Sequence, residues 1–267
     1  MRRTSTFLLL ISLLYVPLLH TQADSNATQL FDRGMNALKG SGPSHNNQTA
    51  LDLLRRSAEL RYVPAQTVVG CFYETGFLVP AEPGQAAEWY RKAAVQDDRL
   101  GEWLLGRLYY TGAGVPRDWS LAERWLLKAA DQGDPFSQYL LGTIKREQGE
   151  NAKAANWFRK AAEQGLPQAQ QQLAQLLKQG LGVTADKFEG YVWLLVSADN
   201  GYPAAIQDLA SLEADLGSTQ VEQAKSRARE LEKTMSRSVT AHGCTGWPGE
   251  FAAVPAPPPP DLQRFCR

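Results

Sequence analysis

Few side chains in this 267-residue chain have the types and spacing that enzyme chemistry requires. A serine acyl-enzyme of the penicillin-binding or β-lactamase type needs Ser-x-x-Lys, with the lysine one helical turn from the nucleophile, and no such run occurs. A zinc enzyme needs clustered ligands, but the only histidines beyond residue 23 are His45 and His242, and His-Glu-x-x-His is absent. We therefore expect no catalytic residue, no metal site and no cofactor. A hydrolase is the least favoured function.

Two glycine-rich loops, 112–118 and 180–186, share the pattern Gly-x-Gly-Val-x-x-Asp. A glycine-rich loop before a helix can bind phosphate, but the phosphate-loop motif ends in Gly-Lys-Ser/Thr, which is absent here. The structural interpretation is that glycine makes the turn, Val115 packs into the core and Asp118 caps the next helix. Basic and acidic residues are equal in number, at 28 each, so the sequence predicts no nucleic-acid partner.

The first 23 residues have the features of a secretory signal peptide. Arg2 and Arg3 precede an apolar run over 7–19, and the small residue Ala23 stands before a predicted cleavage at Asp24. The apolar run is short for a bilayer span, so we expect no stable membrane insertion after cleavage. An uncleaved anchor is the alternative. The protein is therefore expected in the periplasm or secreted.

Export makes disulfides possible for the three cysteines. Cys244 and Cys266 flank the proline-rich stretch of a tail over 237–267, and they form a plausible disulfide pair. Cys71 lies in an apolar helical pattern, where we expect a small buried thiol.

The chain repeats itself. One column of large residues has steps of 36, 32 and 36, and a column of small residues 15 to 19 positions upstream includes Gly106 and Gly142. The tryptophans of the first column are Trp89, Trp125, Trp157 and Trp193. Several columns that share one set of steps indicate about five repeated units, within residues 30–218.

Each unit has the pattern of two helices. In the best example, Ser120 and Glu123 have capping-box spacing, and Trp125 falls on the apolar stripe with Ala129 and Ala130. We expect the tryptophan to fill the space beside the alanine pair. Gly133, Gly165 and Gly201 follow second helices at a position where a positive φ is required. Asp97 stands at this position in the unit 65–97, so a looser ending is expected there.

The combined pattern LG-x-L-Y-x-x-G-x-G-V-x-x-D…A-x-x-W-x-x-K-A-A-x-x-G resembles the Sel1-like repeat family, which is related to tetratricopeptide repeats. The resemblance implies an all-α, right-handed α/α solenoid over 24–218. A charged segment over 219–236 with one narrow apolar stripe is expected to be a C-terminal capping helix. A coiled-coil strand is the alternative for this segment.

The resemblance implies a protein–protein adaptor or regulator, with partners bound on the concave face of the first helices. Aromatic residues and arginine are common in binding hot spots. The candidates of these types on or near that face are Trp103, Arg107, Tyr110, Tyr139 and Arg146. The alternative is that Trp103 and Tyr139 pack between repeats. The expected function is an exported interaction scaffold, and a structural envelope scaffold without a specific ligand is the second possibility.

Overall fold

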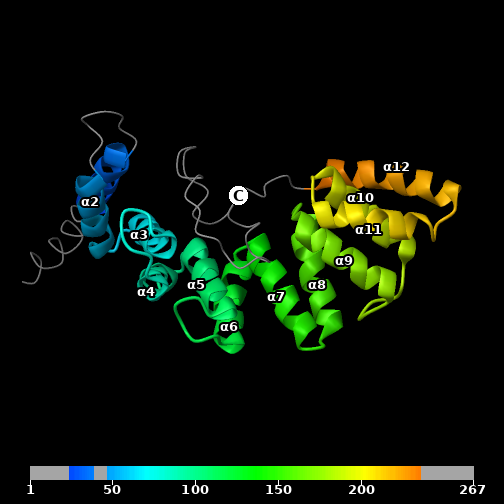
Figure 1. The fold of residues 1–267 in the computed structure, drawn as a ribbon, viewed down its shortest axis with the longest axis horizontal. Helices are drawn as coiled ribbons and strands as arrows, with labels where there is room; N and C mark the ends of the chain where they lie inside the picture. The colour runs from blue at the N-terminus through cyan, green and yellow to red at the C-terminus, as the bar shows by residue number, and fades with distance from the viewer. Residues whose placement is uncertain (1–23, 39–46, 236–267) are drawn as a thin grey trace, which may run out of the picture. The chain divides into compact units, whose positions relative to one another are not determined.

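A computed structural model describes residues 24–38 and 47–235 (Figure 1). All regular secondary structure in these two ranges is helical. The expected signal peptide, the tail over 237–267 and both Cys244 and Cys266 lie outside the described residues.

Helices alternate along the chain as the first and second helix of each repeat, called helix A and helix B. The first helix A covers residues 24–38. The helices that follow are α2 (Asn47–Glu59), α3 (Val63–Thr75), α4 (Pro83–Ala94), α5 (Arg99–Thr111), α6 (Trp119–Asp131), α7 (Pro135–Glu147), α8 (Asn151–Glu163), α9 (Pro167–Gln179), α10 (Lys187–Asp199), α11 (Pro203–Glu213) and α12 (Ser218–Thr234).

The described residues form two compact units. The first runs to Gly101 and includes the loop residues 113–115, and the second contains α6 to α12. Helix α5 begins in the first unit and continues in the second from Glu102. In the second unit the partners in sequence pack as pairs, α7 on α8 and α9 on α10.

Large side chains of helix B pack against glycines of helix A. A Cβ atom added at Gly142 would lie 2.6 Å from Phe158 Cδ1, and one added at Gly106 would lie 2.8 Å from Leu126 Cγ. In the first unit, Gly70 faces the ring of Tyr90 in the same way. The recurring glycine is therefore a space requirement, since any larger side chain would overlap the facing helix.

The expectation that tryptophan fills this space is wrong by one position. Leu126, not Trp125, is fully buried on α6 beside Ala122, Ala129 and Ala130. Trp125 lies at the edge of the stripe and is half-buried. The lysine three residues later covers its ring, with Lys128 Nζ 5.4 Å from the centroid. The same arrangement joins Trp89 to Lys92 and Trp157 to Lys160, whereas Trp193 is buried.

Aspartate caps the second helices, as the loop pattern predicts. Asp118 accepts a hydrogen bond from Leu121 N at 2.9 Å, and Asp186 accepts one from Glu189 N at the same distance. The capping box at Ser120 is incorrect, because α6 begins before it. Glu123 instead pairs with Lys145 of α7 at 2.6 Å.

In the turn that follows each second helix, a single residue adopts a left-handed backbone conformation. Gly133, Gly165 and Gly201 have φ of 86°, 89° and 76°. Asp97 takes the same conformation with φ 57°, and Arg61 does so with φ 67° in the first repeat. Helix α4 ends at Ala94, and the turn after it is hydrogen-bonded from Gln96 N to Ala93 O and from Asp97 N to Ala94 O, so the looser ending at Asp97 stays a prediction.

Helix α12 is the C-terminal capping helix of the fold. Its Val221, Ala224 and Ala228 are buried, and the helix packs against α10 (Figure 1). The structure places its start at Ser218, one residue before the expected boundary. Helix α11 buries only Ala205 and Leu212 and leaves Ile206 55% exposed.

Candidate functional site

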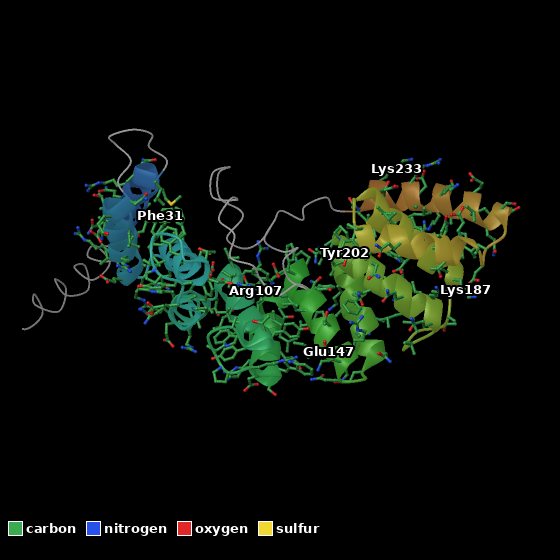
Figure 2. The ribbon with its side chains drawn as sticks, in the orientation of Figure 1. Phe31, Arg107, Glu147, Lys187, Tyr202 and Lys233 are labelled. Atoms are coloured by element: carbon green, nitrogen blue, oxygen red, sulfur yellow. The ribbon has the colours of Figure 1, made fainter. Side chains whose placement is uncertain are left out.

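Three of the five candidate binding residues lie on α5 and are buried. Trp103 is 1% exposed, Arg107 5% and Tyr110 9%. The Trp103 ring packs on Phe136 at 5.8 Å between centroids, and the Arg107 guanidinium lies 5.3 Å from the Trp103 ring. Figure 2 labels Arg107 on this helix. Trp103, Arg107 and Tyr110 have i, i+4 and i+7 spacing, and we expected this stripe to be mostly offset from the packing residues of the same helix. That expectation is incorrect, because every position from Gly101 to Leu108 is buried.

The other two candidates, Tyr139 and Arg146 on α7, are half-buried. The Tyr139 ring lies 5.8 Å from Phe158. The Arg146 guanidinium donates a hydrogen bond to Gln172 of α9. The burial of Trp103 favours the packing alternative for that residue. The assignment of all five to a binding surface stays a prediction, in which Tyr139 and Arg146 are the accessible members.

Polar contacts connect successive first helices of the second unit. Beyond the Arg146–Gln172 pair, Gln175 Nε2 of α9 donates to Asp208 Oδ2 of α11 at 3.2 Å. Lys178 Nζ donates to Ser211 Oγ at 2.7 Å. We call the half-buried and exposed residues of this row the A-helix face, consisting of Tyr139, Arg146, Gln172, Gln175, Lys178, Asp208 and Ser211. The row has mixed charge and is suited to polar contacts with another chain.

A row of buried polar residues on the first helices, here called the amide ladder, was not predicted from the sequence. Gln138 of α7 donates to Ala130 O of the preceding helix at 3.4 Å and accepts from Gln164 at 2.8 Å. Glu102 occupies the equivalent position on α5 and accepts from Gln132 at 2.7 Å. The same two contacts connect Gln66 with Ala58 and Gln96 in the first unit. The glutamines recur with the tryptophan column's steps, so the signal was present in the sequence.

Electrostatic perturbations are local and follow from ion pairs and burial. Burial opposes the charged form of Lys145, but its hydrogen bonds to Glu123 and Glu150 outweigh this and raise the lysine pKa. Burial raises the pKa of Asp98, whose carboxylate accepts from Gly101 N at 2.7 Å. Each group has a structural partner, so neither shift indicates a catalytic acid or base.

Cys71 differs from its expectation. The residue is 6% exposed on α3, and it is disulfide-bonded rather than a buried thiol. Tyr90 Oη lies 3.5 Å from its sulfur and donates to Glu74 Oε2 at 2.7 Å. The Cys244–Cys266 pair stays a prediction, since both cysteines lie outside the described residues.

Across residues 24–38 and 47–235, no group of three or more His, Cys, Asp or Glu side chains is arranged to hold a metal ion. Within the same ranges, no helix combines the length and the apolar character that crossing a membrane requires.

Comparison with known proteins identifies the repeat. No curated protein sequence matches the chain. The structure of a Sel1 repeat protein from Oxalobacter formigenes is 25% identical, with a TM-score of 0.63 over 77% of this chain and 88% of that one. A protective antigen of uropathogenic Escherichia coli with an SLR fold is 27% identical, with a TM-score of 0.51 over 79% of this chain. The alignment covers 54% of the antigen, so this chain spans about half of its length.

The family model agrees in register with the helix pairs. The Sel1 repeat matches residues 30–62, 63–98, 100–134, 135–166 and 167–202. These segments make up more than half of the chain, and each matches one helix pair of the structure. The protein is an all-α repeat solenoid that belongs to the Sel1 repeat family.

Proposed function

We propose that this Sel1 repeat protein is an exported scaffold that binds another protein through the A-helix face of its second unit. The repeat fold commonly serves protein–protein interaction, because stacked repeats present an extended surface. The chain's own chemistry supports a binding role over catalysis, since Ser-x-x-Lys and His-Glu-x-x-His are both absent from the sequence.

The observation that carries this proposal is the side-chain connection between α7, α9 and α11. Arg146 contacts Gln172, and Lys178 contacts Ser211, so these three helices present neighbouring polar side chains. These side chains keep surface open to solvent, unlike Trp103 and Arg107 on α5. An extended segment of a partner protein that lies across this row can form hydrogen bonds with these side chains in place of their present partners, and the buried core need not rearrange.

Site-specific photo-crosslinking tests the surface. A photoreactive residue at position 175 is expected to capture a protein partner in the cell envelope. The triple variant Arg146→Ala, Lys178→Ala, Ser211→Ala should reduce that capture at least tenfold while its helical circular dichroism is retained. Removing these polar contacts leaves the buried residues intact, so a folding defect is not expected.

A matched control uses exposed positions on second helices of the same unit. Arg124→Ala, Lys153→Ala and Asn156→Ala remove exposed side chains from α6 and α8, and they should leave capture unchanged. Equal capture from a photoreactive residue at position 124 would contradict a specific face. The absence of any saturable crosslink would favour the structural scaffold without a ligand.

Export is tested separately. The mature protein is expected to begin at Asp24 and to fractionate with periplasmic or secreted proteins. N-terminal sequencing of protein recovered from the cell checks both the cleavage and the compartment. Recovery of Arg2 and Arg3 in a membrane-bound form would support the uncleaved anchor instead.

A further inference from the structure

One face of α11 is open where the equivalent face of α9 is covered. On α9, Gln170 of the amide ladder and Ala174 of the small-residue column are both 0% exposed. The residues at the same repeat positions on α11 are Ile206, which is 55% exposed, and Ala210, which is also exposed. Within the described ranges, the face of α11 that contains Ile206 and Ala210 is therefore uncovered, and we call it the open face.

Helix α12 does not cover the open face, although it follows α11 in the chain. Its buried residues are Val221, Ala224 and Ala228, and it packs against α10, as α11 also does (Figure 1). The exposure of Ala210 shows that no large side chain of α12 lies over it. The last two helices of the second unit thus leave a helix-packing surface unused.

The α7–α8 pair shows what kind of helix fits such a surface. Phe158 of α8 is fully buried against Gly142, where an added Cβ would lie 2.6 Å from its ring. The alanines of α8 let the two helices approach closely, and four of them are fully buried, namely Ala154, Ala155, Ala161 and Ala162. A helix that places one large apolar side chain between alanines therefore packs on a small residue of helix A.

The charge around the open face selects a basic helix. Helix α11 and the turn after it, residues 203–217, contain three acidic residues and no basic residue. The acidic residues are Asp208, Glu213 and Asp215, and Glu213 is exposed on α11 itself. Complementary charge steers a partner and selects against like-charged ones. A helix with lysine or arginine beside its apolar residue is therefore the best match.

A second copy of the chain is a poorer match for this face. Pairing α11 with α11 of another copy would bring acidic residues together, which is unfavourable. An eleven-residue helix is also only about 17 Å long and about 10 Å wide, so one face offers far less than the roughly 800 Å² per partner of a standard interface. The open face suits a contact that extends a larger surface.

We propose that the open face of α11 binds a basic amphipathic helix of the partner protein, whose one large apolar side chain packs on Ala210 beside Ile206. The inference rests on the proposed function and deepens it, because Asp208 and Ser211 of the A-helix face lie on the same helix. A partner segment that crosses the A-helix face therefore continues directly onto the open face. The apolar contact supplies the buried anchor that binding hot spots contain.

The sequence of α8 provides a peptide for the test. The peptide NAKAANWFRKAAE, residues 151–163, contains three basic residues and one acidic residue, and Phe158 is its large apolar side chain. A hydrocarbon staple between positions 152 and 156, both exposed on α8, keeps it helical, since a free peptide of this length is marginally stable as a helix. Fluorescence polarisation of the labelled peptide with the full chain measures the affinity. Saturable binding is expected.

Two matched changes locate the contact. The peptide variant Phe158→Ala keeps every charge and is expected to bind about tenfold more weakly. The protein variant Ile206→Ser is expected to weaken binding of the unchanged peptide by about the same factor. Leu181→Ser removes another exposed apolar side chain of the second unit and should leave the affinity unchanged. Both altered protein positions are exposed, and circular dichroism checks that each variant is folded.

Each result decides the proposal. Equal binding of the Phe158→Ala peptide would overturn it in favour of charge attraction alone. It would also be refuted by the absence of saturable binding or by an Ile206→Ser protein that binds normally. A dimer in sedimentation that dissociates on Ile206→Ser would assign the face to a second copy instead.

The outcome is distinguishable from that of the proposed function. If the peptide does not bind while position 175 still captures a partner, the A-helix face remains and the helix contact is refuted. If the peptide binds as expected but position 175 captures nothing, the open face remains a helix-binding surface and only the proposed A-helix face is contradicted.

Discussion

The ring of Phe158 occupies the space that Gly142 leaves open on the facing helix. An added Cβ would lie 2.6 Å from ring atoms Cδ1 and Cε1. A glycine inside a helix costs about 1 kcal/mol relative to alanine. At this position the lower helix propensity is accompanied by room for a large side chain of the facing helix. The same relationship recurs between Gly70 and Tyr90 and between Gly106 and Leu126.

Gly142→Ala is expected to destabilise the protein despite its better helix propensity. Overpacking typically costs about 1–3 kcal/mol, which exceeds the propensity gain at its upper end. Denaturant unfolding measures the free energy of unfolding of Gly142→Ala, Phe158→Ala and the double variant. The double variant is expected to lose less stability than the sum of the losses in the two single variants. Gly217→Ala is the control, because nothing lies within 4 Å of a Cβ there. Additive losses would show that ring and glycine are not coupled.

Arg61→Gly is expected to stabilise the first unit. Arg61 is exposed, and its φ of 67° is strained for a residue with a Cβ. A left-handed conformation costs an L-residue about 1–2 kcal/mol, partly offset by the greater unfolded-state freedom of glycine, so we expect a net gain of about 0.5–1 kcal/mol. Thermal unfolding measures it. Arg61→Ala retains the strain, and an equal gain from that variant would attribute the effect to the lost side chain.

Gln138→Leu is expected to cost about 1 kcal/mol, because it removes the hydrogen bonds to Ala130 O and from Gln164, while Ala130 O keeps the backbone donor Gly133 N at 2.9 Å. The residue is 5% exposed, so water cannot easily replace the amide. Urea unfolding compares this variant with Gln172→Leu on the half-buried A-helix face, where a change under about 0.5 kcal/mol is expected. Equal effects would mean that the amide ladder adds no specific stability.

Stability is expected to fall between pH 10 and 12 through Tyr191. Burial, with the negative charges of Glu213 and Glu222, raises the pKa of this tyrosine from 10.0 to about 12. The folded state thus keeps its proton where the unfolded state loses it, so stability is fully present below pH 10 and declines as pH rises toward 12. Tyr191→Phe should lose about 1–2 kcal/mol less than wild type over that interval. Parallel pH profiles of the two proteins would contradict this role.

The sequence predicted the features that depend on near neighbours in the chain. Asp118 and Asp186 cap helices because a carboxylate three residues before a backbone N–H can reach it. Gly133 follows a helix because only a residue without a Cβ adopts a positive φ without strain. The period of the repeats identified the family and the fold.

The tertiary structure decided which of two adjacent residues enters the core. Trp125 and Leu126 both lie near the apolar stripe, but only Leu126 faces Gly106, because the facing helix determines where space is available. The same limit applies to the candidate site. Periodicity describes one helix at a time, whereas the burial of Trp103, the Glu123–Lys145 pair and the disulfide of Cys71 depend on segments brought together by folding.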